Sequence, residues 1–197
     1  ALNCLLIFYK HVPSVTNFPV YLGQLDTLLE PFMEDVDDHT AKKLLKNFLV
    51  HIDRTILDSF SHANIGPKPT RAGRLLLEVE AQLKQAVPNL TLKYEEGVTD
   101  DDFAIQAVKT ALYSAKPSFA NHRMFKEELG DDYVIASCYN GLPLGGGSYT
   151  LCRLILSNIA KRASTVEDFR SKQLPYVMDI MARYMDARVR FEVEESG

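Results

Sequence analysis

The stretch Asp132-Tyr133-Val134-Ile135-Ala136-Ser137-Cys138-Tyr139-Asn140-Gly141 says most about how this chain folds and what it does. Its apolar run from Tyr133 to Ser137 has the length and composition of a buried strand, and it leads into the thiol of Cys138. The glycine-rich run 142–147 that follows allows a backbone or a ligand to approach closely. Cys138 is therefore a candidate site of chemistry. The alternative is a packing role, because free cysteine is among the most buried residue types.

Helical periodicity dominates the rest of the chain, with apolar residues recurring at three- and four-residue spacing. Thr70 is placed to cap one helix, and Thr99 to cap another whose first turn holds three aspartates. The apolar stripe of that second helix comprises Phe103, Ala104, Ala107, Val108, Ala111 and Leu112. The predicted helices cover 20–33, 40–60, 71–86, the residues between Thr99 and Lys116, 121–129 and 165–184.

Three stretches are predicted to be strands: 89–94, 133–137 and 189–193. Residues 89–94 alternate between polar and apolar side chains, as a strand with one buried face does. Because helices separate these strands, the sequence predicts a helix-rich α/β architecture with a parallel sheet.

Composition excludes several classes of protein. With 46% hydrophobic residues, the chain can bury a core, and we expect 1–197 to form a single domain, within a longer protein because it begins at alanine. Its 26 acidic and 22 basic residues include no dense basic cluster, so we expect no nucleic-acid partner. We expect no membrane span, since no apolar run approaches about 20 residues. Three widely spaced cysteines favour a reducing cytoplasm over a disulfide framework.

Motifs for metal or nucleotide binding are weak. Residues 145–148 lack the Gly-Lys-Ser/Thr ending of a phosphate-binding loop. The acidic run 100–102 is more simply the first turn of a helix than a metal cluster. His51 and His62 lie on a predicted helical stretch without a zinc-binding pattern. We predict no metal site.

A resemblance to a known family adds what spacing does not provide. Gly23-Gln24-Leu25-Asp26-Thr27-Leu28-Leu29-Glu30-Pro31-Phe32 resembles the Gly-Arg-Leu-Asp-Gln-x-Leu-x-Pro-Tyr/Phe segment of the glycyl radical enzymes, the superfamily of pyruvate formate-lyase. Further along, 88–93, Lys116-Pro117-Ser118-Phe119-Ala120-Asn121 and 133–138 are similar, in order, to the segments that lead to the radical cysteine of that family. The continuation through 148–154 looks most like the YjjI-type branch.

The resemblance implies a ten-stranded α/β barrel, with Cys138 on a loop inside it. It also implies a partner, an activating enzyme that uses S-adenosylmethionine and an iron–sulfur cluster to install a radical on a glycine near the C-terminus. That radical would oxidise Cys138 to a thiyl under anaerobic conditions. A homodimer is a further possibility, and no cofactor is expected to bind this chain directly.

The chain departs from the family pattern in three places. Asn140 stands where the eliminase branches carry a glutamate two residues beyond the cysteine, and an amide does not titrate. Ser137 and Tyr139 flank Cys138, so the adjacent cysteine pair of pyruvate formate-lyase is absent. The Arg-x-x-Gly-Tyr/Phe radical segment does not occur in the 197 residues.

The leading interpretation is thus an internal fragment of a formate acetyltransferase-like glycyl radical enzyme that performs thiyl chemistry on a small polar metabolite. Besides the catalytic Cys138, adjacency suggests Tyr139, Asn140, Gly145 and Gly146 as substrate-binding residues. The alternative is a catalytically silent α/β binding module with a core cysteine.

Overall fold

The structure is a computed structural model that describes residues 1–11, 20–54, 61–136, 140–144 and 152–196. The chain forms two compact units, 1–145 and 146–197, which are described separately. The expectation that 1–197 is a single domain within a longer enzyme stays a prediction.

A four-stranded parallel sheet lies at the centre of the N-terminal unit, with its strands in sequential order. The strands are β1 (Val20–Gln24), β2 (Ser61–Ile65), β3 (Asn89–Tyr94) and β4 (Ser118–Asn121). Across the sheet, Asn64 lies opposite Thr91, and Thr91 lies opposite Ser118. The predicted α/β class with a parallel sheet is confirmed, and β3 has the predicted bounds.

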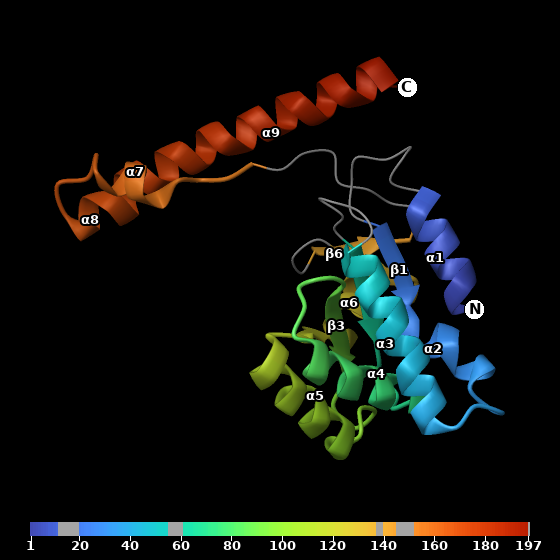
Figure 1. The fold of residues 1–197 in the computed structure, drawn as a ribbon. Coiled ribbons are helices and arrows are strands. Elements are labelled where there is room, and N and C mark those ends of the chain that lie inside the picture. The colour runs from blue at the N-terminus through green and yellow to red at the C-terminus, as the bar shows by residue number, and fades with distance from the viewer. Residues whose placement is uncertain (12–19, 55–60, 137–139, 145–151, 197) are drawn as a thin grey trace. The chain divides into compact units, whose positions relative to one another are not determined.

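Helices α3, α4 and α5 lie side by side along one face of this sheet (Figure 1). The strand residues that point at them are apolar and buried, among them Leu22, Ala63, Leu90 and Leu92. Phe48, Leu76 and Phe103 fill the space from the helix side. The helices of this unit are α1 (Leu2–His11), α2 (Leu25–Leu29), the 3₁₀ helix η2 (Glu30–Phe32), α3 (Asp38–Arg54), α4 (Arg71–Leu83), α5 (Asp101–Ser114) and α6 (His122–Leu129).

The opposite face of the same sheet is polar. Side chains alternate along a strand, so the neighbours of the apolar residues point the other way. On β2 and β3 these neighbours are His62, Asn64, Thr91 and Lys93, and all four are buried. Buried polar groups require partners, so this face has to be covered by groups that hydrogen-bond to it.

An antiparallel hairpin provides part of that cover. It consists of β5 (Tyr133–Ala136) and β6 (Asn140–Pro143), with Ala136 opposite Asn140. Gly141 allows α6 to pack closely, because a Cβ there would lie 2.4 Å from Cε1 of Phe125. The sequence predicted β5 but not β6, whose Asn-Gly-Leu-Pro composition is typical of a turn.

The helix caps predicted beyond the carboxyl ends of the strands are confirmed in part. Thr70 caps α4 as predicted, accepting a hydrogen bond from Gly73 N at 2.9 Å. The predicted cap at Thr99 is wrong: Asp100 caps α5, while Thr99 Oγ1 accepts a hydrogen bond from Glu95 N in the preceding turn. Gly66 has φ +76°, and an added Cβ would lie 2.6 Å from Leu92 Cδ1.

Several predicted elements are wrong in type. Residues 20–33 begin with β1 rather than a helix, because the apolar spacing at their start fits both periods. His62 lies in β2 and not on a helix, because the alternation of His62 and Asn64 with Ala63 and Ile65 falls in a strand of only five residues. The α5 stripe is only partly buried, with Val108 and Leu112 exposed. β4 was also missed, whereas α3 and α6 are confirmed, with the predicted end of α3 at 55–60 outside the described residues.

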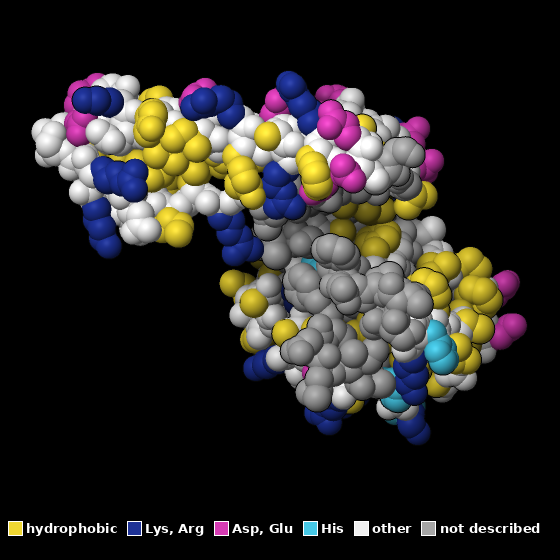
Figure 2. All heavy atoms as spheres, turned by 90° about the horizontal axis from the view of Figure 1, so that it is seen from above, with side chains coloured by type: hydrophobic (Ala, Val, Ile, Leu, Met, Phe, Trp, Pro, Cys, Tyr) yellow, Lys and Arg dark blue, Asp and Glu magenta, His cyan; other side chains and the backbone are white. Residues whose placement is uncertain are grey.

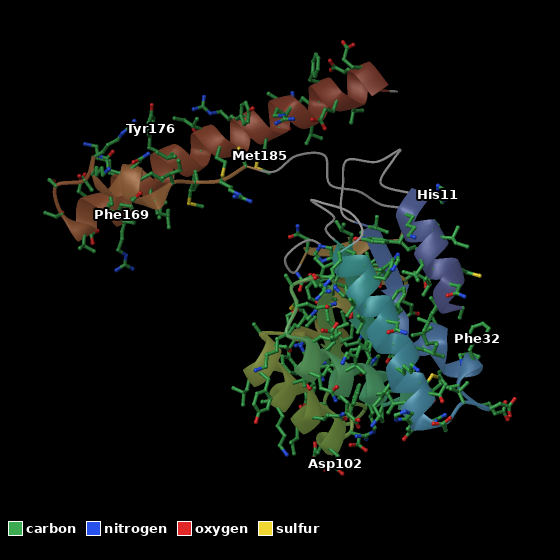
Figure 3. The ribbon with its side chains drawn as sticks, viewed as in Figure 1. His11, Phe32, Asp102, Phe169, Tyr176 and Met185 are labelled. Atoms are coloured by element: carbon green, nitrogen blue, oxygen red, sulfur yellow. The ribbon has the colours of Figure 1, made fainter. Side chains whose placement is uncertain are left out.

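The C-terminal unit is helical, with α7 (Leu156–Ala160), α8 (Val166–Asp168), the π-helical turn η3 (Phe169–Gln173) and α9 (Leu174–Ser196). Figure 3 labels Phe169, Tyr176 and Met185 along it, and Figure 2 shows hydrophobic side chains gathered on the face in view. Thr165 caps this stretch as predicted, accepting a hydrogen bond from Asp168 N at 3.0 Å. The strand predicted at 189–193 is wrong, because these residues belong to α9.

Ion pairs at helical spacing explain why residues 189–193 are helical and not a strand. Arg190 reaches Asp186 at 2.8 Å, and Arg188 reaches Glu192 at 3.1 Å. Such pairs stabilise a helix and have no counterpart in a strand, where residues four apart are too distant. Within the described ranges, no helix is long and apolar enough to cross a membrane.

Candidate functional site

The predicted site residues fall mostly outside the described structure. Cys138, Tyr139, Gly145 and Gly146 lie outside the described residues. Asn140 is described: it is the first residue of β6, it pairs with Ala136 of β5, and it is exposed. The candidate site is therefore built from the hairpin on either side of 137–139 and from the polar sheet face beneath it.

Asn64 of β2 attaches the hairpin to the sheet. Its side-chain amide mimics a neighbouring strand: Oδ1 accepts from Ile135 N at 2.9 Å, and Nδ2 donates to Ile135 O at 2.9 Å. Tyr21 of β1 donates its hydroxyl to the same Oδ1 at 3.0 Å. Asn64 and Ile135 are almost completely buried, at 0% and 1% exposure, so these hydrogen bonds have no competition from water.

Lys93 of β3 attaches the hairpin at a second point. Its Nζ donates to Tyr133 O at 2.9 Å and lies 4.2 Å from the centre of the Tyr133 ring. Burial lowers the pKa of Lys93, and the nearby carboxylate of Asp26 opposes that shift. An ammonium donating to a carbonyl beneath an aromatic ring is stabilised without a carboxylate in direct contact. Asn64 and Lys93 together bond three backbone groups of β5: the N–H and C=O of Ile135 and the C=O of Tyr133.

Tyr133 continues into a chain of titratable groups at the carboxyl ends of β3 and β4. Its hydroxyl lies 2.7 Å from His122 Nδ1, and His122 Nε2 lies 3.7 Å from Glu95 Oε2. Burial raises the pKa of Tyr133 to about 12, with the charge of Glu95 adding to the shift. Burial also lowers the pKa of His122, although Glu95 opposes this shift. The geometry therefore favours a neutral imidazole and a protonated phenol.

The lowered pKa of His122 predicts a pH dependence of stability. The unfolded chain binds a proton on this histidine near pH 6.5, before the folded chain does. The stability that depends on neutral His122 is then present above about pH 6.5 and is lost as the pH falls below it. We expect His122→Gln to flatten the fall in unfolding free energy between pH 7.5 and 5.5, measured by urea denaturation of the full-length protein.

The exposed His39 provides the matched control for this measurement. His39→Gln is expected to leave the pH profile as in the wild type. His62, whose pKa is also lowered by burial, keeps part of the slope in the His122 variant. A His122→Gln profile parallel to that of the wild type would contradict the assignment.

These attachment residues were not singled out from the sequence. The alternation over 89–94 placed Thr91 and Lys93 on the same face of a strand, which is the one available signal for Lys93. Asn64 and His122 gave no such signal, because β2 was not predicted and His122 opens a short helix. Their contacts join residues far apart in sequence, 71 positions in the case of Asn64 and Ile135.

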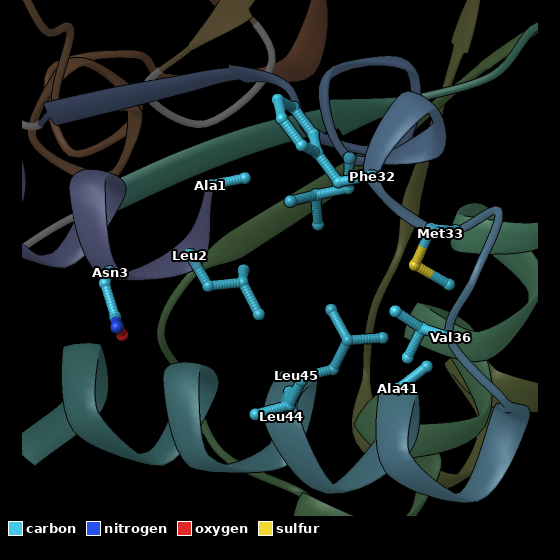
Figure 4. A pocket seen from close by; sticks show the side chains of 10 residues that line it. Ala1, Leu2, Asn3, Phe32, Met33, Val36, Ala41, Leu44 and Leu45 are labelled. Atoms are coloured by element: carbon cyan, nitrogen blue, oxygen red, sulfur yellow. The ribbon is translucent and has the colours of Figure 1, made fainter.

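A separate hollow lies away from this face. It has a volume of about 240 Å³ and lies between α1, the α2–η2 segment and α3, where Leu2, Phe32, Met33 and Leu45 line it (Figure 4). Its described lining carries no titratable side chain, so it offers nothing for acid–base or metal chemistry. Among the residues that the structure describes, no three His, Cys, Asp or Glu side chains gather as metal ligands.

The fold and the site together define the class of architecture: a parallel α/β layer with a buried polar face that the hairpin β5–β6 partly covers. The glycyl radical enzyme YjjI-like family profile matches residues 1–197. The chain therefore belongs to that family, as the sequence resemblance indicated. The YjjI-type assignment is confirmed, whereas the ten-stranded barrel stays a prediction.

Two curated relatives match along the whole chain. An uncharacterized protein of Haemophilus influenzae is 48% identical over 197 residues, and the uncharacterized protein YjjI of Escherichia coli is 42% identical over 197 residues. The chain spans only 38% of the length of each relative. No solved structure matches it significantly.

Proposed function

We propose that this chain is the cysteine-bearing part of a glycyl radical enzyme in which Cys138 forms the thiyl that attacks a small polar metabolite. Membership of the YjjI-like family supports the radical class. The observation that carries the proposal is the attachment of β5 to the polar sheet face through Ile135, three residues before Cys138. A strand held through a buried residue whose N–H and C=O are both hydrogen-bonded is a rigid support for a reacting residue.

Cys138 would act by hydrogen-atom transfer. Its thiol gives its hydrogen atom to the glycine-centred radical of the full-length protein, which leaves a sulfur radical and a closed-shell glycine. The sulfur then takes a hydrogen atom from a carbon of the substrate and later returns it to the product. The S–H bond is broken and formed in turn, so no external oxidant is consumed. This chemistry needs a site that excludes water and side reactions.

Asn140 restricts the reaction that follows. An amide side chain cannot take up the proton that the glutamate of the eliminase branches would accept, so Asn140 would bind substrate by hydrogen bonds only. Tyr139, Gly145 and Gly146 are proposed as further substrate contacts from their adjacency to Cys138. The formate acetyltransferase-like classification, a cytoplasmic location, a homodimer and an activating enzyme that uses S-adenosylmethionine all belong to this proposal.

The first test concerns the radical itself. Anaerobic incubation of the full-length protein with its activating enzyme and S-adenosylmethionine is expected to give a doublet signal by electron paramagnetic resonance, because one α-hydrogen remains on a glycine radical. The 197 residues alone are expected to give none, since the Arg-x-x-Gly-Tyr/Phe segment does not occur in them. The short chain provides the matched control for adventitious radicals. A full-length protein that gives no glycine radical would favour the silent binding module.

A further inference from the structure

We propose that Asn64 is a positioning residue, which places Cys138 within reach of its radical partner by holding β5 against the sheet. This inference rests on the proposed function. Asn64 itself touches neither substrate nor sulfur in the proposal: it acts through the backbone of Ile135.

The geometry assigns this role to Asn64 rather than to its neighbours on the sheet face. The amide contacts both backbone groups of Ile135, whereas Thr91, directly across in the register, bonds to Ser118 Oγ at 2.8 Å within the sheet. Lys93 contacts the other end of β5, at Tyr133. Among Asn64, Thr91 and Lys93, and within the residues that the structure describes, Asn64 thus makes the contact nearest in sequence to Cys138.

Tyr21 adds a third hydrogen bond to the amide of Asn64. Its hydroxyl donates to the Oδ1 of Asn64 that also accepts from Ile135 N. The oxygen must therefore face both donors, which leaves the NH₂ group directed at Ile135 O. A rotated amide would oppose like groups at both contacts with Ile135, so these two backbone groups give the amide one stable orientation.

Asn64→Asp is the sharpest change. The two side chains have nearly the same shape, and a carboxylate still accepts from Ile135 N and from Tyr21. It cannot donate to Ile135 O, however, and would face that carbonyl oxygen with like charge. We therefore expect this end of β5 to shift away from the sheet, since a buried acceptor left without a donor is costly.

A readout that needs no known substrate follows from the chemistry of the thiol. In D₂O the thiol of Cys138 carries deuterium, which it transfers to the glycine radical; the sulfur then takes hydrogen or deuterium back. Repetition replaces the α-hydrogen of the glycine by deuterium, and the paramagnetic doublet collapses. The rate of collapse reports how often sulfur and glycine come within reach, independently of how much radical is present.

We expect Asn64→Asp to slow the collapse at least tenfold in the activated full-length protein, because a displacement of about 1 Å at a reacting group can cost about 100-fold. Tyr21→Phe, which keeps the amide but removes one of its three hydrogen bonds, should slow it severalfold. Thr91→Val is the matched control: it removes a buried hydrogen bond from the same face without touching the hairpin, and its collapse rate should equal that of the wild type. Radical yield and melting temperature are measured alongside for all variants.

The outcomes separate the two claims. If the doublet of Cys138→Ala collapses in D₂O as fast as that of the wild type, the proposed function is overturned, and this inference with it. Collapse that depends on Cys138 but proceeds at the wild-type rate in Asn64→Asp would overturn the positioning role alone. Equal slowing by Thr91→Val and Asn64→Asp would do the same, since it would reduce the effect to general stability. If Asn64→Asp does not fold, an unchanged rate in Tyr21→Phe overturns the inference.

Discussion

Replacing Cys138 by alanine in the full-length, activated protein is expected to abolish product formation and the collapse of the doublet in D₂O, while the glycine radical still forms. The flanking Ser137 and Tyr139 cannot substitute, because a hydroxyl holds its hydrogen atom too strongly to serve the same role. Hydrogen-atom transfer through this sulfur is the single path that the proposal provides, so the expected loss is complete rather than partial.

Cys152→Ala is the matched control for that loss. Cys152 is half-buried and lies just before α7, in the C-terminal unit. Its removal is expected to cost a small amount of packing energy and to leave turnover and exchange intact. Electron paramagnetic resonance and product analysis on the same samples decide between the two thiols. Substantial turnover by the Cys138 variant would remove the central claim, and loss of exchange in the Cys152 variant would move the chemistry to the other sulfur.

The largest effect on stability is expected from breaking a buried ion pair. Lys116 Nζ lies 2.9 Å from Glu80 Oε2 of α4, and their side chains are 5% and 0% exposed. Lys116 also donates to Pro88 O at 2.8 Å, ahead of β3. Lys116→Met would leave a carboxyl group buried without its cation, which typically costs about 3–5 kcal/mol of unfolding free energy.

The pH dependence of the loss and an added Glu80→Leu substitution provide two controls for this prediction. Burial raises the pKa of Glu80, and Lys116 opposes that shift. Without Lys116 the carboxyl is more readily protonated in the folded state, so the loss from Lys116→Met should be smaller at pH 5 than at pH 8. Adding Glu80→Leu should recover most of the stability.

Lys42 of α3 and Glu78 of α4, the helix that also carries Glu80, are likewise 2.9 Å apart, but their side chains are exposed to solvent. Lys42→Met should therefore have little effect in urea denaturation. Equal losses from Lys42→Met and Lys116→Met would contradict the argument from burial.

The sequence predicts best where one local pattern decides the structure. The alternation in 89–94, the cap at Thr70 and the helical spacing of 40–54 each depend on neighbours a few residues away, and each is confirmed. Strand β2 was not predicted from the sequence. It has five residues, and both of its faces are buried, one by the helices and one under the hairpin. Its polar and apolar residues alternate over five positions only, and Ser61 and Asn64 are residue types that are also typical of a loop.

In the candidate site, too, the features that depend on local sequence were predicted, and those that depend on distant contacts were not. A cysteine after an apolar run is a local feature, so Cys138 and β5 could be proposed from the sequence. The support beneath them could not, because Asn64 and Lys93 meet β5 through contacts between distant parts of the chain. Their partners are backbone groups, which carry no sequence signal at all. Asn64 would have been found only by knowing which strand lies under Ile135.

The side chains that bond to the free edge of β5 also protect the protein from its own copies. An uncovered edge presents a row of unpaired N–H and C=O groups, which is a template for a strand from another molecule. Here Asn64 occupies both groups of Ile135, and Lys93 occupies Tyr133 O with a charged side chain. A foreign strand would have to displace a buried amide and a buried ammonium before it could pair. The residues that hold the hairpin thus also block one route to edge-to-edge association.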